Sequence, residues 1–331
     1  MTRRDRMRKT LQGERTDRPP MSFWRHFYDR EGSAEALAKV MLEFQKTYDW
    51  DFMKVNPRAS YHVEDWGVRT KRPGEGPLDK PKVVESPIRE PKDWDKIRPL
   101  DPTKGTLGEM LDAEERIASE IQGETDWLMT VFNPISIASD LVNDDAVFVD
   151  HLRHHGEQVH GALRVITQTY AAFVRETMQR GASGIFFATT DFGNATVIDK
   201  QLLEEFGRPY DLKVLDEARR GSLNTIHVCG PRAFVREHLD YPTAIVSWAD
   251  HEPGNPSISE LRPLTTKTLL TGIDHERTMV QGPPEAVQSQ ARAAIEASGG
   301  TRFILGPGCA VPSAAPERHY AAAREAVLAC A

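Results

Sequence analysis

The chain has 331 residues, of which 39% are hydrophobic and 27% charged, a balance that can bury a large core and excludes an intrinsically disordered protein. The formal net charge of −7 gives no general attraction to nucleic acid. Three cysteines are too few for a disulfide framework, and the charged start and the lack of a long apolar run are not typical of a secretory signal or a membrane span. We therefore expect a cytoplasmic enzyme with neither nucleic-acid nor membrane partners.

Eight short apolar runs recur along the chain. They are rich in β-branched and aromatic residues and are bounded by Pro, Gly, Asn or Asp, which is typical of strands. They do not alternate strictly between polar and apolar residues, so we expect burial on both faces. In chain order the predicted strands are residues 21–27, 52–55, 127–132, 184–189, 223–228, 244–248, 268–272 and 303–305.

Segments with helical periodicity lie between most of these runs. Strands that alternate with helices indicate right-handed βαβ units and a parallel sheet. Eight strands favour a (β/α)8 TIM barrel over an open doubly wound sheet, and they favour one domain over residues 1–331 although the length alone would suit two. The predicted helices are residues 34–48, 106–122, 144–180, 200–220, 284–298 and 315–329.

Two regions depart from this rhythm. Residues 73–102 contain seven prolines among many charges. Because this segment falls inside the second βα unit, we interpret it as an ordered excursion near the barrel mouth and not as a linker between domains. The helical pattern of residues 144–180 is unusually long and predicts either two helices or an extension that contacts a partner.

In a barrel of this kind, chemistry is carried by residues at the C-terminal ends of the strands. This rule predicts a set of candidates, of which we expect Arg25, His26, Asn56 and Asp191 to contact the substrate. Turn formation is the alternative explanation for Asn56 and Asp191, and a surface ion pair is the alternative for Arg25. The full set at the strand ends is Arg25, His26, Asn56, Asn133, Asp191, His227, Cys229, Asp250, Asp274 and Cys309.

His227 and Cys229 form the most specific pair in this set. Two residues apart on an extended strand end, they point to the same face and can bind one metal ion, and Cys309 joins them at the mouth beside the eighth strand. One histidine and two thiolates suit catalytic zinc with one open position. The alternative is two buried cysteines that act as small hydrophobes. Asp250 is a candidate catalytic residue, fourth ligand, partner of His227 or plain strand cap.

The sequence around these ligands resembles the methylcobamide:thiol methyltransferases, typified by the coenzyme M enzymes, of the uroporphyrinogen decarboxylase superfamily. The paired zinc motifs of that branch are similar to Thr225-Ile226-His227-Val228-Cys229-Gly230 and Gly306-Pro307-Gly308-Cys309. Weaker similarity is found at Arg18-Pro19-Pro20-Met21, Phe206-Gly207-Arg208-Pro209-Tyr210 and Ser247-Trp248-Ala249-Asp250. The resemblance therefore covers nearly the whole chain, and it agrees with the predicted barrel.

The resemblance implies a zinc enzyme that moves a methyl group between a corrinoid and a small thiol or methyl donor, in a direction that the motifs do not distinguish. No Asp-x-His-x-x-Gly corrinoid-ligand motif occurs in the chain, so the corrinoid would arrive on a separate protein or as free cobalamin. Superfamily analogy also suggests a homodimer.

Two alternatives stay open. A decarboxylase of the same superfamily is disfavoured, because the chain has Trp24-Arg25-His26-Phe27 and Val55-Asn56-Pro57 where those enzymes carry Arg-Gln-Ala-Gly-Arg and Ser-Asp-Ile. A non-catalytic zinc- or corrinoid-binding subunit would dock through residues 144–180.

Overall fold

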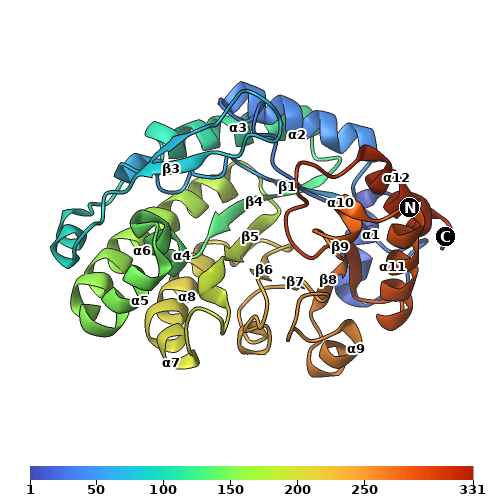
Figure 1. The fold of residues 1–331 in the computed structure, drawn as a ribbon. Helices are drawn as coiled ribbons and strands as arrows, with labels where there is room; N and C mark the ends of the chain where they lie inside the picture. Colours follow the sequence, from blue (N-terminus) through green and yellow to red (C-terminus); the bar gives the residue numbers. More distant parts are fainter. Residues whose placement is uncertain (331) are drawn as a thin grey trace.

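A curved parallel sheet surrounded by helices forms the centre of the computed structural model, which describes residues 1–330 (Figure 1). The strands follow one another in the sheet in chain order, and nearly every strand residue is buried, as the apolar runs predict. The sheet contains β1 (Phe52–Val55), β4 (Asp126–Phe132), β5 (Gly184–Thr189), β6 (Thr225–Val228), β7 (Ile245–Trp248), β8 (Thr268–Ile273) and β9 (Phe303–Pro307).

The first predicted strand, residues 21–27, is not a regular strand. Residues 20–25 lie between β9 and β1 and close the barrel through two isolated bridges, Met21 to Leu305 and Arg25 to Val311. The Asp51 N–H also donates to the Met21 carbonyl at 2.9 Å. Two prolines precede Met21 and lack the N–H that a ladder needs, which explains the irregular start. The (β/α)8 class is confirmed, with an irregular segment in the place of its first strand.

Helices cover the outside of the sheet. Four of them, α1, α4, α9 and α10, were not predicted, and the long pattern of residues 144–180 is two helices that meet at His155. One π-helical turn (Leu203–Gly207) interrupts the pattern of residues 200–220. The helices are α1 (Arg3–Gln12), α2 (Ala34–Tyr48), α3 (Gly105–Ile121), α4 (Pro134–Val142), α5 (Asp145–His154), α6 (Gly156–Gln179), α7 (Lys200–Leu202), α8 (Arg208–Glu217), α9 (Ile258–Leu261), α10 (Thr278–Gln281), α11 (Pro284–Ala297) and α12 (Glu317–Leu328).

The strands separate two hydrophobic clusters. Successive side chains of a strand point to opposite faces, so Phe52 packs inside the barrel, whereas Met53 and Val55 pack against the outer helices. The inner cluster also contains Met7 of α1, and this helix therefore covers the bottom of the barrel. The same alternation directs every second residue beyond Phe52 toward the barrel interior.

A buried ion cluster fastens the bottom of the barrel. Asp51, which precedes β1, is fully buried and accepts from Arg6 at 2.5 Å and from Arg18 at 2.7 Å. Its carboxylate also accepts from the Met21 N–H at 2.8 Å. The cluster thus ties α1, the closing segment and β1 together.

The proline-rich segment is ordered. It contains β3 (Lys82–Glu85), which pairs antiparallel with β2 (Arg69–Lys71), and a 3-10 turn (Pro91–Lys96) whose Trp94 is buried. The loop between β2 and β3 extends away from the barrel at the left of Figure 1. Among the helices within residues 1–330, none is long and apolar enough to cross a membrane.

Candidate metal centre

His227, Cys229 and Cys309 meet at the C-terminal ends of β6 and β9. One ligand atom from each lies within 4.8 Å of the others, and the two Sγ atoms are 3.6 Å apart. Gly308 makes this approach possible, because a Cβ there would lie 2.8 Å from the Ala249 backbone. The predicted three-residue cluster is therefore assembled in space from segments 80 residues apart.

The imidazole of His227 is oriented with one nitrogen free. Its Nδ1 lies 3.1 Å from the buried Ser247 Oγ, whereas Nε2 is buried and has no hydrogen-bond partner within residues 1–330. A metal-binding Nε2 must be unprotonated, so with a metal bound Nδ1 would carry the proton and donate a hydrogen bond to Ser247 Oγ. The Nε2 atoms of His238 and His319 are also buried and unpaired, but only that of His227 lies, within residues 1–330, in a cluster of possible metal ligands, where a metal ion would satisfy it.

The contact between the two cysteines shifts their pKa values in opposite directions. A hydrogen bond from Cys229 holds the pKa of Cys309 well below its ordinary value, and His227 and His275 lower it further. The same hydrogen bond raises the pKa of Cys229, and burial adds to this increase. A divalent ion bound by both sulfur atoms would hold them as thiolates and displace their protons. One neutral imidazole and two thiolates fit zinc.

A cavity of about 160 Å³ opens beside these ligands. Its volume is close to that of an engineered protein cavity that holds benzene. Of the residues predicted to contact substrate, His26 and Asn56 line it, both near strand ends as expected. The other lining residues are Trp24, Lys54, Pro57, Thr130, Phe132, Phe186, Ala188, Thr189, Thr190, His227, Cys229, Cys309 and Ala310.

Lys54 is the residue of this cavity that sequence reasoning missed. It is the only charged residue of β1, and because it follows Phe52 by two positions it points into the barrel. Its Nζ donates to Asn56 Oδ1 at 2.6 Å and lies 4.6 Å from the centre of the Phe186 ring. Burial lowers the pKa of Lys54 to about 7. A lysine inside a short apolar run is the signal that could have found it.

The other predicted substrate contacts lie outside the cavity lining. Arg25 donates to the Ser313 carbonyl at 3.0 Å and lies over the Phe27 ring. Asp191 follows the lining residue Thr190, and its pKa is raised by burial first and then by the nearby charges of Asp140 and Cys309. A role for Arg25 or Asp191 in substrate binding stays a prediction.

Asp250 is held by its own neighbours. Its Oδ1 accepts from Thr271 Oγ1 at 2.6 Å and from the Gly272 N–H at 3.3 Å. The carboxylate is not a member of the three-residue ligand cluster. A catalytic role for Asp250 stays a prediction, as does a role in zinc binding. Asn133 and Asp274 serve local structure: the former caps α4 and the latter accepts from Arg277 at 2.6 Å.

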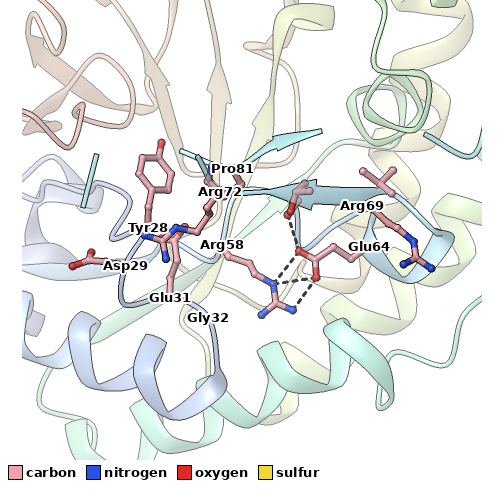
Figure 2. Close-up of a pocket in the computed structure, with 12 residues that line it drawn as sticks. Tyr28, Asp29, Glu31, Gly32, Arg58, Glu64, Arg69, Arg72 and Pro81 are labelled. Atoms are coloured by element: carbon pink, nitrogen blue, oxygen red, sulfur yellow. Dashed lines mark hydrogen bonds and ion pairs between the residues drawn. The ribbon is translucent and has the colours of Figure 1, made fainter. Parts of the chain in front are cut away.

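A larger cavity of about 560 Å³ is lined in part by residues of the β2–β3 hairpin (Figure 2). Tyr28, which lines it, stacks on His26 of the inner cavity with ring centres 5.1 Å apart. Arg58 also lines it, and this guanidinium is neutralised by ion pairs to Glu64 and Glu109, each 2.9 Å long. Most of the residues that line this outer cavity are polar or charged, and the stacked rings of Tyr28 and His26 link it to the cavity beside the metal ligands.

Fold and site together define a (β/α)8 barrel protein with a candidate metal centre at the C-terminal ends of its strands. The chain belongs to the uroporphyrinogen decarboxylase (URO-D) family, whose sequence profile matches residues 2–329.

Known structures show the same fold. A methyltransferase from Methanosarcina mazei superposes with a TM-score of 0.83 at 18% identity, over 98% of this chain and 98% of that one. A B12-independent methionine synthase from Shewanella sp. W3-18-1 superposes with a TM-score of 0.60 at 12% identity, over 90% of this chain and 87% of that one. No curated protein matches the sequence significantly. At these identities the likeness establishes the fold alone.

Proposed function

We propose that this protein is a zinc-dependent methyltransferase that moves a methyl group between a corrinoid and a small thiol or methyl-donor substrate. The observation that carries the proposal is the cluster of His227, Cys229 and Cys309 beside a small cavity. The fold shared with a protein described as a methyltransferase supports it.

Each residue of the centre has a defined task in this proposal. His227, Cys229 and Cys309 hold the zinc, and Ser247 fixes the imidazole so that Nε2 faces the metal. Bound zinc supplies Lewis acidity, which lowers the pKa of a substrate thiol so that it is a thiolate at neutral pH. The aromatic walls, among them Phe132 and Phe186, exclude water from the substrate and limit its orientation.

The size of the inner cavity separates the two reactants. About 160 Å³ accommodates a small substrate but not a corrinoid macrocycle. The corrinoid, free or on a partner protein, would therefore approach from the open side, and the methyl group would pass at the mouth of the cavity. The same volume argues against a tetrapyrrole decarboxylase. Such an enzyme must bind several substrate carboxylates, whereas within residues 1–330 Lys54 is the only lysine or arginine that lines this cavity.

Two measurements test the proposal. Metal analysis of the purified protein should find one zinc per chain, lost in Cys229→Ser and retained in Cys330→Ser, because Cys330 is remote and exposed. Full zinc occupancy in Cys229→Ser would contradict the ligand assignment.

The second measurement follows the absorbance of methylcobalamin with a panel of small thiols, and that of cob(I)alamin with methyl donors. We expect demethylation or methylation that depends on zinc. No spectral change with any thiol or donor, free or on a corrinoid protein, would reject catalysis and leave a zinc- or corrinoid-binding subunit as the better explanation.

A further inference from the structure

Lys54 is a buried lysine without a carboxylate partner, and the nearest negative charge that acts on it is that of Cys309, one of the candidate metal ligands. It is only 5% exposed, and no carboxylate within residues 1–330 forms an ion pair with it. Its one hydrogen bond goes to the uncharged Asn56, and its remaining contacts are the faces of Trp24 and Phe186. A buried ammonium is costly unless it is paired, so its place in the cavity wall calls for an anion.

The metal centre does not supply this anion once it is loaded. Two thiolates and a neutral imidazole balance the two charges of zinc, so that the centre of His227, Cys229 and Cys309 is close to neutral. The lysine therefore lacks a partner in the state that the proposed function requires.

Asn56 adds a second unused donor at the same place. Its Oδ1 accepts from Lys54 and its side chain is 3% exposed, but its Nδ2 is buried without a hydrogen-bond partner in the described chain. Lys54 and Asn56 are two residues apart on β1 and its end, so both point into the cavity. Their free N–H groups form a site for two oxygen atoms of one acidic group.

We propose that Lys54 and Asn56 bind the carboxylate of the small substrate, and that this substrate is a short-chain thiol with a terminal carboxylate. The thiol end of this substrate rests on the proposed function, whereas the carboxylate end rests on Lys54 and Asn56 alone. The cavity volume limits the molecule to about six non-hydrogen atoms, the size of benzene. The acid end thus contacts β1, while the sulfur lies toward the zinc ligands. The depressed pKa of Lys54 agrees with a site whose anion is absent.

The test compares two thiols of equal shape and different charge, 3-mercaptopropionate and 3-mercaptopropionamide, by calorimetric titration of the zinc-loaded protein. We expect wild type to bind the acid roughly 10- to 100-fold more tightly than the amide, as hydrogen bonds to a charged group would give. In Lys54→Met this preference should disappear while the affinity for the amide stays within about 3-fold. Asn56→Ala should reduce the preference in part.

Lys267→Met is the matched control, because this lysine is half-buried and donates to backbone carbonyls far from the cavity. It should keep the full preference for the acid. Equal binding of both thiols by wild type, or an unchanged preference in a folded Lys54→Met, would overturn the proposal. Since binding is measured, a preference for the acid together with no corrinoid chemistry would reject the methyl transfer and retain the carboxylate site.

Discussion

The two ends of β1 use buried charge in opposite ways. Asp51, just before the strand, accepts from Arg6, Arg18 and a backbone N–H, so that its charge is fully compensated. Lys54, three residues later, has one uncharged partner. The comparison teaches that the bottom of the barrel uses charge to hold the fold, whereas the mouth carries charge that costs stability and is available to a ligand.

The largest expected effect is at the bottom. Asp51→Asn leaves two buried guanidinium groups without their shared carboxylate, and breaking a buried ion pair of this kind costs about 3–5 kcal/mol of unfolding free energy. Urea denaturation measures the loss. Glu43→Gln removes an exposed ion pair with Arg30 and should change the unfolding free energy far less, because solvent screens the pair. Similar losses of unfolding free energy in the two variants would contradict the role of the Asp51 ion cluster in stabilising the fold.

Substitution of Lys54 is expected to raise the unfolding free energy, whereas substitution of Asp51 lowers it. Its pKa is about 7 in the folded protein and has its ordinary value of 10.5 in the unfolded chain, so the unfolded state binds more protons between these pH values. Stability therefore rises with pH from about 7 to 10.5 and is lowest below that window. Lys54→Met should remove this rise and stabilise the protein by about 1–4 kcal/mol at pH 7. Denaturation of wild type and Lys54→Met at pH 7 and 9 measures both effects. A Lys54→Met variant that is less stable than wild type at pH 7 would contradict the contrast between Asp51 and Lys54.

A pair of buried serines tests the two ends with the same substitution. Ser247→Ala removes the hydrogen bond that orients His227 and should weaken zinc affinity by about 10- to 100-fold. Ser22→Ala, near the bottom, removes a hydrogen bond to the Phe52 carbonyl and should lower stability by about 1 kcal/mol without a change in zinc affinity. Competition with a chromophoric chelator measures the affinity, and equal zinc binding by both variants would argue against the role of Ser247.

The smallest expected effect concerns the metal-free protein. Cys229→Ser and Cys309→Ser change only the weak contact between two thiols, so each should alter stability by less than about 1 kcal/mol when zinc is absent. Thermal unfolding in the presence of a chelator measures this. A loss of several kcal/mol would show that the cysteines hold the fold themselves, as the residues at the bottom do.

The sequence predicted those parts of the fold that have a strong local pattern. Residues 52–55 and 184–189 are strands with the expected bounds, because apolar runs between turn residues indicate buried strands. Helix α4 was missed because every residue except Asp140 is buried, which leaves no amphipathic period to detect. The irregular closure at residues 20–25 depends on pairing with the far end of the chain, which no local pattern contains.

The same distinction applies to the site. The cluster of His227, Cys229 and Cys309 was predictable because ligand type and strand-end position agree. Lys54 and Ser247 were not predicted because the role of each depends on its surroundings in three dimensions. Lys54 lacks a carboxylate partner, and Ser247 orients the imidazole of His227.

The closing bridges between Met21 and Leu305 and between Arg25 and Val311 bear on how the protein is made. The partners are separated by almost the entire chain, so the ring of strands cannot close until synthesis has passed residue 311. Until then, β1 has an open edge that other nascent chains can pair with. Truncation before β9 should therefore yield an aggregation-prone fragment and not a smaller barrel, and correct folding depends on the emergence of residues 303–311 from the ribosome.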